Sequence, residues 1–529
     1  VNDATALIWN HTFSATLLNQ ARANAAGWRW NEVTSNPQEP FGLPQDNIDN
    51  IGSANMGNAY FGAPGPSNLD QWTYSYNDVL TKVIGKQNIK MGGDWTRLYY
   101  LNNPIYASRP AFNFHNLWDF ANDAPFHESG TFDHSSGLPF ANREDNRTSI
   151  WGFFVQDDYK IKPNLTINAG LRWSYFAPYF SRENNLDVVQ FGAGSAALTG
   201  MNIRVGGNLA TADKNNWGPQ IGFSWQPLSS QGKAVLRGGF GINYNQNEIA
   251  ILANGFGNPP NAVNASFNCG YPYTTNPSCA GNGILYQTAT SPNSIFGYPP
   301  NPAAITTFSS ANLPLTGTTG VTAFPAHMRT ITNYHYSLEA DYQLPFSTVA
   351  SLGYDGSELR HLLVQNIWNA VAAQAGIAQN PVVNFIDYYE NAGNGNDNAM
   401  VATLNHNFDH HFQAEAMYTW GKAMDENSGP YSEDPYPYDI HAAYGRSDYN
   451  VANAFKLFGL WQPVFFSGHS AAEKIAGGWT LSGIWNVDSG FPWNPTYGTN
   501  GVYMQGTYYS LRPASLMKGY GTSTANKNF

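Results

Sequence analysis

The sequence of 529 residues is poor in charge and especially in basic side chains. Charged residues make up 12%, and Lys plus Arg total 26 against 37 Asp plus Glu, which gives a net charge of -11. A protein that clamps phosphate backbones needs clustered cations, so this balance excludes a nucleic-acid-binding protein. No apolar run approaches the roughly 20 residues of a helical membrane span, which excludes a topology built on transmembrane helices.

Aromatic side chains are abundant instead, with 31 Tyr, 31 Phe and 16 Trp, or 15% of the chain. The mean hydropathy of -0.38 therefore reflects uncharged polar residues rather than charges. So much aromatic surface must be removed from water, which excludes a disordered chain. The length fits two to four soluble domains or one very large closed sheet.

Strict alternation is the dominant local pattern. From Trp151 the odd positions are mostly apolar or aromatic, and after Pro163 and Asn164 the same phase continues to Tyr175. A period of two on both sides of a two-residue turn predicts an antiparallel hairpin with one apolar face.

The same unit recurs along the chain, with further turns near residues 85–88, 229–232, 345–347 and 409–411. We count about fourteen such strands, many of about 10 to 13 residues, against about 5 to 6 in soluble proteins. The strands often begin or end on Trp or Tyr.

The connections between hairpins are unequal. One set takes two to five residues, whereas the other includes residues 31–70, 102–146 and 246–332, which are rich in Asn, Gly, Pro and Tyr. Short periplasmic turns, long extracellular loops and aromatic girdles are typical of transmembrane β-barrels. The alternative is that the aromatic residues serve as strand formers in a soluble core.

Several segments together resemble the barrel of TonB-dependent outer-membrane receptors, most of all the Oar-like branch with many members in acidobacteria. The segments are GFFVQDDYKIKPNLTINAGLRWSYF at 152–176, NNWGPQIGFSWQP at 215–227, KAVLRGGFGINYN at 233–245, HYSLEADYQLPFSTVASLGYDGSELRHLL at 335–363 and GGWTLSGIWNVDSGFPWNPTYG at 477–498.

The resemblance implies a large antiparallel barrel in the outer membrane of a Gram-negative bacterium. Extracellular loops would capture a solute, and a plug inside the barrel would be moved by the TonB complex. Barrels of this kind have about 22 strands. Residues 1–529 match the barrel alone, without the plug, its TonB box or the amino-terminal carboxypeptidase-regulatory-like domain, so we expect the chain to be a barrel fragment.

Three alternatives to a transporter stay open. They are a structural or adhesive surface barrel, a passive porin-like channel, and a soluble β-sandwich or carbohydrate-binding protein. Of these, the two barrels need no plug. The expected partners are outer-membrane lipid and lipopolysaccharide, the TonB complex acting through the plug, and an extracellular ligand that the sequence does not identify.

The sequence has two cysteines, Cys269 and Cys279, in a loop rich in Asn, Gly and Pro. We expect a disulfide between them, which would close a short loop in an oxidising compartment. Two free thiols or half of a metal site are the alternatives, although no second Cys pair completes a zinc pattern.

The segment from Asp425 to Asp448 interleaves carboxylates with tyrosines. Asp434 and Asp439 are weak candidates for calcium ligands, because calcium takes carboxylate and carbonyl oxygens, but the segment lacks EF-hand spacing. A solvated external loop is the simpler interpretation, and direct contact with a ligand such as a sugar is a third.

The sequence offers no catalytic residues and no cofactor motif. It lacks the GxSxG, HExxH, Walker and strand-linked GxGxxG patterns, and the neighbouring Asp157 and Asp158 point to opposite faces of one strand. We therefore expect no enzyme. The lumen-facing polar positions are Gln156, Asp158, Asn168, Arg172, Gln220, Arg237, Glu339, Asp341 and Glu415.

Overall fold

The computed structural model of the chain describes residues 2–32, 45–48, 59–61, 67–103, 111–121, 127–132, 143–227, 232–268, 307–315, 317–409, 411–429, 439–464, 471–492, 503–504 and 507–508.

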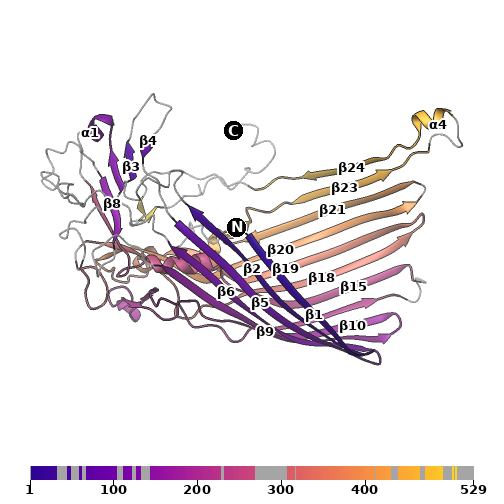
Figure 1. The fold of residues 1–529 in the computed structure, drawn as a ribbon, viewed down its shortest axis with the longest axis horizontal. Coiled ribbons are helices and arrows are strands. Elements are labelled where there is room, and N and C mark those ends of the chain that lie inside the picture. Colours follow the sequence, from indigo (N-terminus) through magenta and orange to yellow (C-terminus); the bar gives the residue numbers. More distant parts are fainter. Residues whose placement is uncertain are drawn as a thin grey trace.

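One sheet of 17 strands dominates the molecule (Figure 1). Its long strands form an antiparallel meander in which each strand, apart from the first and the last, pairs with the strand before and the strand after it. In sheet order they are β1 (Asn2–Ser14), β2 (Leu17–Glu32), β5 (Ser67–Ile84), β6 (Gln87–Asn103), β9 (Glu144–Lys162), β10 (Leu165–Phe176), β14 (Trp217–Trp225), β15 (Ala234–Asn245), β18 (Ile331–Leu344), β19 (Thr348–Ile367), β20 (Val383–Asp409), β21 (Phe412–Asp425), β23 (Asn453–Trp461) and β24 (Leu481–Asp488). The predicted fold class is confirmed.

Alternation along each strand separates an outer face from an inner face. In β9, Trp151 and Phe153 are 41% and 53% exposed, whereas Gly152 between them is buried. Register extends this division across the sheet, because Trp151 pairs with Trp95 of β6 and Phe153 with Trp173 of β10. The apolar positions predicted to share one face therefore do so, and they form an aromatic outer surface.

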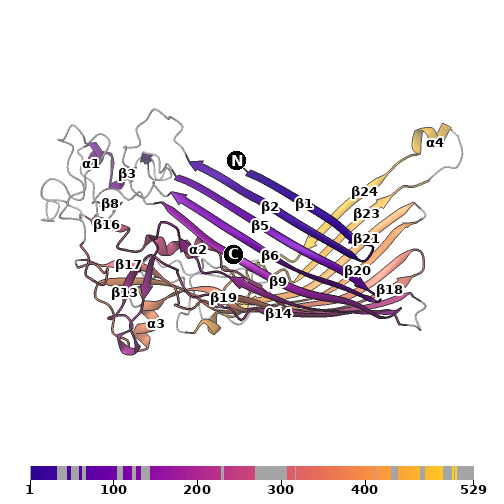
Figure 2. The same cartoon turned by 60° about the horizontal axis from the view of Figure 1, so that its bottom comes forward.

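The sheet curves strongly, and β1 and β24 are its two edges (Figure 2). Within the described residues, β1 pairs with β2 alone and β24 with β23 alone. Every residue of both strands is exposed. Each inner strand, in contrast, satisfies its backbone groups on both sides, as a membrane-spanning wall requires.

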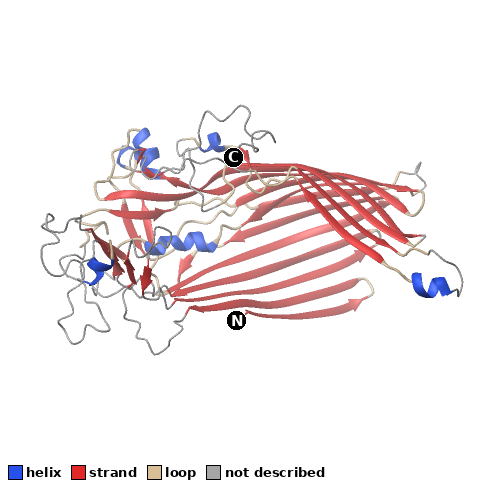
Figure 3. Ribbon diagram, turned by 90° about the horizontal axis from the view of Figure 1, so that it is seen from above, coloured by secondary structure: helices blue, strands red, loops and turns tan. Residues whose placement is uncertain are grey.

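The connections between the long strands differ in length between the two ends of the sheet (Figure 3). At one end the hairpins turn over residues 15–16, 85–86, 163–164 and 345–347, and Gly85 adopts a φ of 58° that favours glycine. At the other end lie the long connections, including residues 177–216 and 246–330. This is the predicted asymmetry between short turns and long loops. The connection of β23 to β24, at residues 462–480, is an exception, because it is long and places a helix at the short-turn end (Figure 1).

The shorter elements lie mainly in or beside the long connections. They are β3 (Gln45–Ile48), β4 (Ala59–Phe61), β7 (Ala111–Phe114), α1 (Leu117–Ala121), β8 (His127–Phe132), β11 (Phe180–Ser181), β12 (Asp187–Gln190), η2 (Gly194–Ala196), β13 (Asn202–Val205), α2 (Ile249–Leu252), η4 (Ala253–Gly257), β16 (Val263–Asn268), β17 (Thr319–Ala323), α3 (Trp368–Gln374), η6 (Ile440–Ala443), β22 (Gly445–Arg446), α4 (Ala471–Ala476), β25 (Tyr503–Met504) and β26 (Thr507–Tyr508). None of the described helices is long and apolar enough to cross a membrane.

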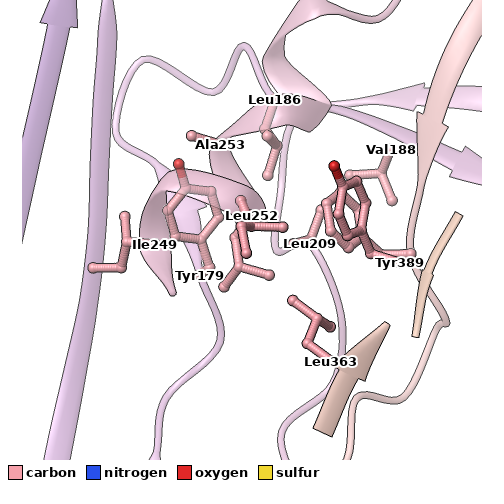
Figure 4. Packing of buried hydrophobic residues seen from close by; sticks show 11 residues of the cluster. Tyr179, Leu186, Val188, Leu209, Ile249, Leu252, Ala253, Leu363 and Tyr389 are labelled. Carbon is pink, nitrogen blue, oxygen red and sulfur yellow. The ribbon is translucent and has the colours of Figure 1, made fainter. Parts of the chain in front are cut away.

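Two hydrophobic cores lie at the long-loop end. We call the described residues of 177–216, 249–263, 307–330 and 361–394 the loop assembly. One core gathers Tyr179, Leu186 and Leu252 with their neighbours (Figure 4), and the other gathers Leu198, Ile203 and Ile386 among others. The loop assembly therefore packs like a small globular domain.

Strand β20 is the clearest element that the sequence pattern did not predict. It runs for 27 residues, and its upper half contains ENAGNGNDNA, in which Asn and Gly have low strand propensity. Pairing with β19 on one side and β21 on the other holds this half extended.

Candidate functional site

The inner face of the sheet carries a network of polar side chains on β6, β9 and β10. Arg172 donates to Asp94 across β9, at 2.8 Å, and the side chain passes directly over Gly152, where a Cβ would lie 2.0 Å from its guanidinium. Asp158 accepts from Asn168 at 2.7 Å and lies 3.8 Å from Lys90. Glycine at position 152 therefore makes room for the cross-strand ion pair.

A second network lies on β15 and β18. Arg237 donates to Glu339 at 3.1 Å and to Asp341 at 2.5 Å, and all three side chains face inward. Asn405 donates to Glu415 farther along the wall, at 3.2 Å. Each of these pairs is partly exposed, so it contributes little stability by itself.

All the predicted lumen-facing polar positions lie opposite the aromatic outer face, as their pairing partners show. Two of the nine positions are arginine and four are carboxylate, and both arginines form ion pairs with carboxylates on nearby strands. Such a surface can hydrogen-bond to protein or to a polar solute.

The loop assembly covers the long-loop end of this wall and is tied to it by β17. Strand β17 pairs in parallel with the start of β20, from Thr319 opposite Val383 to Ala323 opposite Tyr388. Asn380 extends the connection, because its side chain donates to the carbonyl of Leu198 at 2.9 Å. These contacts fix the loop assembly to the upper halves of β19 and β20.

Asp187 lies at the centre of the loop assembly and is fully buried. Both of its carboxyl oxygens accept from Asn261, at 3.0 and 3.2 Å, and its carbonyl accepts from Asn258 at 2.9 Å. Burial raises the pKa of this carboxyl to about 8, although the hydrogen bonds from Asn261 oppose the shift. Asp187 is therefore a buried structural acid that titrates near neutral pH.

A cavity of about 70 Å³ lies where the loop assembly meets the ends of β10 and β15. Its lining includes Tyr179, Asn247, Leu252 and Arg329. Ligand pockets for small molecules usually measure about 300 to 1,000 Å³. This cavity can hold a few water molecules, but a solute of siderophore or oligosaccharide size does not fit.

Asp439, one of the predicted calcium ligands, has a local structural role. Its carboxylate accepts from the backbone N–H of His441 at 3.2 Å and caps η6. The imidazole of His441 contacts the buried carboxylate of Glu426, which raises the pKa of His441. Asp434 lies outside the described residues. Within the described residues, no group of three or more His, Cys, Asp or Glu side chains could hold a metal ion.

Cys269 and Cys279 also lie outside the described residues, so the disulfide stays a prediction. The loop assembly itself was missed by sequence reasoning. Short apolar runs such as Val188–Val189 and Val321–Phe324 were the available signal, but nothing in their spacing indicates that they pack together.

Comparison with known families identifies the class of this sheet. A family model described as an outer membrane beta barrel domain matches residues 1–528. The chain belongs to this family. The exposed aromatic face is therefore the lipid-facing surface of an outer-membrane β-barrel, and the short turns are its periplasmic end.

A solved structure of an outer membrane transporter shares this fold at low identity. The outer membrane transporter YddB from Escherichia coli is 9% identical, with a TM-score of 0.52, and the alignment covers 87% of this chain and 48% of that one. The FrpB iron transporter from Neisseria meningitidis (F5-1 variant) is also 9% identical, with a TM-score of 0.45, over 87% of this chain and 49% of that one. The chain thus spans about half the length of these structures. No curated protein matches it by sequence.

Proposed function

We propose that the chain forms the barrel of an active transporter that moves a solute, or an exported protein, across the outer membrane. The observation that carries this proposal is the two-sided wall, with aromatic side chains facing lipid and a polar inner face that carries ion pairs. The interior of a transmembrane barrel is polar, and such a wall can hydrogen-bond to a plug or to a passing solute.

The loop assembly supports the same proposal. Capture of a scarce solute is favoured when the binding surface is already ordered, because less conformational entropy is then lost on binding. Its two cores and the buried Asp187 hold the described loops in one arrangement. Ligand selection would lie on the outer surface of these loops.

Energy coupling through TonB rests on the resemblance of the sequence to TonB-dependent receptors. By this resemblance, a plug inside the barrel contacts the inner polar wall and is moved by the TonB complex at the expense of the proton gradient. The same segments favour the Oar-like branch and an acidobacterial source. The protein performs no chemical reaction under this proposal and needs no cofactor.

The test uses the full-length protein in cells, with a mixture of ferric siderophores and a series of fluorescent oligosaccharides as probes. Active transport predicts uptake that stops when the proton gradient is collapsed by an uncoupler or when the TonB gene is deleted. Uptake that continues without the gradient would establish a passive channel instead. Absence of uptake, with a loss of cell adhesion on gene deletion, would establish a structural or adhesive barrel.

Two matched variants test whether the transported solute passes through the lumen of the barrel. Arg237→Ala leaves Glu339 and Asp341 without their cation on the inner wall and should change the uptake rate several-fold. Arg29→Ala removes an equivalent ion pair, with Asp70, from the outer face and should leave uptake unchanged. Equal effects of the two substitutions would contradict a path through the lumen.

We also propose that Cys269 and Cys279 form a disulfide, because an oxidising compartment favours pairing of the two cysteines present. Alkylation of the purified protein with and without reductant, followed by mass spectrometry, tests this. Labelling of both thiols without reductant would overturn it.

A further inference from the structure

An apolar groove of about 750 Å³ crosses the lipid-facing surface of β15, β18, β19, β20 and β21. These strands lie side by side in Figure 1. Its walls include Leu338, Leu352, Met400 and Trp420. Leu338, Leu352 and Trp420 are 50%, 54% and 60% exposed, so the groove is open to the hydrocarbon.

The position of the groove along the strands assigns it to a leaflet. Lys422 lines its upper end and lies ten residues beyond Phe412, where β21 leaves the periplasmic turn. At about 3.3 Å per residue and a tilt of about 40°, Lys422 lies roughly 25 Å above that turn, which is the height of the apolar band of such barrels. The groove therefore ends at the headgroups of the outer leaflet.

Two cationic side chains lie at this upper end of the groove. Lys422 lies on β21, and Arg446 lies on β22, which pairs with β21 at Met424. Lys422 and the partner of Arg446 are two residues apart on one face of β21, so both cations can reach one anionic group. Asn398, which pairs with Lys422 on β20 and accepts from Tyr354 at 2.7 Å, adds a polar rim.

Their charges are not neutralised by the protein. Three outward arginines at the loop end have a carboxylate partner: Arg29 with Asp70 at 2.8 Å, Arg147 with Asp145 at 2.6 Å and Arg360 with Glu358 at 3.0 Å. A fourth, Arg97, donates to Ser149 at 2.8 Å. Across the described part of the chain, neither Lys422 nor Arg446 forms such an ion pair. An apolar groove capped by two free cations is complementary to a lipid with acyl chains and phosphate.

We propose that this groove binds the phosphorylated, multiply acylated glycolipid of the outer leaflet, with its acyl chains along Leu338, Leu352 and Met400 and a phosphate on Lys422 and Arg446. Strands lie about 4.8 Å apart, so a groove from β15 to β21 is roughly 19 Å wide and accommodates several parallel chains. This width favours a multiply acylated lipid over a phospholipid with two chains. The proposal does not depend on whether the barrel transports a solute.

A second outward groove, of about 470 Å³, offers an internal comparison. It is also apolar, with Trp9, Trp95 and Phe153 among its lining residues, but its outward charged group is the carboxylate of Asp78. The chemistry of this second groove disfavours an anionic lipid, so we expect the glycolipid at the first groove.

The test is native mass spectrometry of the full-length protein in detergent, with bis-phosphorylated lipid A, dephosphorylated lipid A and phosphatidylglycerol as probes. The wild type should bind bis-phosphorylated lipid A most tightly. The double variant Lys422→Gln/Arg446→Gln should lose at least about tenfold in affinity, because each cation makes a charge-assisted contact with phosphate. Trp420→Ala should weaken all acylated probes by removing a groove wall.

The matched control is Lys82→Gln/Lys86→Gln, which removes two cations at the periplasmic end and should leave binding unchanged. Heat-dependent mobility on SDS gels verifies that each variant is folded. The proposal is overturned if the two double variants bind lipid A equally well, if removal of the phosphates has no effect, or if phosphatidylglycerol binds as tightly as lipid A.

Discussion

The barrel wall and the loop assembly place their apolar side chains in opposite directions. In the wall, Ile221 and Leu352 are 58% and 54% exposed and point away from the protein, whereas Leu198 and Ile386 in the loop assembly are fully buried. The same residue types therefore depend on lipid in one region and on protein packing in the other. The wall is held by strand pairing and its lipid surroundings, and the loop assembly by a conventional core.

The largest difference between the two regions should come from truncating matched isoleucines. Ile386→Ala leaves a cavity in the loop core and should lower the local stability of the loop assembly by about 2–5 kcal/mol. Ile221→Ala on the lipid face should leave that local stability unchanged. Hydrogen exchange of the amides in β12 and β17 measures both effects, and equal exchange in the two variants would show that the loop assembly has no core of its own.

An introduced charge should destabilise the barrel more on the lipid-facing side of the wall than on its inner side. Ile221→Arg places a cation against the hydrocarbon and should destabilise the folded barrel by about 2–4 kcal/mol. Gln220→Arg, one residue away on the inner face, should cost far less, since the lumen is polar. Urea unfolding in lipid vesicles gives both values. Similar losses for the two variants would mean that the assigned faces are wrong.

The buried carboxyl of Asp187 gives the loop assembly a dependence of its stability on pH. Because the pKa of Asp187 is about 8 when folded and near 3.8 when exposed, the neutral form is favoured by folding. Stability should therefore be greatest below about pH 4 and decline by a few kcal/mol as the pH rises through 8.

The substitution Asp187→Asn should make the pH profile of the loop assembly shallower, whatever its effect on the absolute stability. Part of the slope should remain, because burial also raises the pKa of Asp387 and of Glu390. Hydrogen exchange of the loop amides from pH 5 to 9, corrected for intrinsic rates, provides the measurement. An unchanged slope in the variant would assign the pH dependence to another group.

The smallest effect concerns a single turn of the wall. Gly85→Ala forces a side chain into a φ of 58° and should cost about 1 kcal/mol, although no atom lies within 4 Å of the added methyl group. Gly459→Ala is the control, because its Cβ also meets no atom and its φ is ordinary. Urea midpoints of the two variants should differ, and identical midpoints would exclude strain at this turn.

The sequence predicted the regular part of the wall because each lipid-facing strand carries its own alternating signal. Turns at 163–164 and 345–347 were placed correctly, since the phase on both sides of each turn is unambiguous. The sequence pattern did not predict a strand in the upper half of β20, because its Asn and Gly residues do not form an apolar face. That stretch is extended because two neighbouring strands pair with it, which is a property of the sheet and not of the segment.

The candidate sites were less predictable than the fold. The inner polar positions followed from alternation, but their hydrogen-bond partners did not. Arg172 and Asp94, for example, are 78 residues apart in the sequence. Lys422 and Arg446 were unremarkable in the sequence, where residues 423–445 separate them. Their placement on adjacent strands, at the end of a groove built from five strands, depends on register.

The sequence by itself determined which residues face lipid and which end of the barrel carries the loops, because a period of two and unequal loop lengths are local properties. Only the tertiary structure decided how the loops pack, where Asp187 is buried and which cations lack a partner. These features arise when segments far apart in the chain meet, and their free energies depend on contacts that no local pattern encodes.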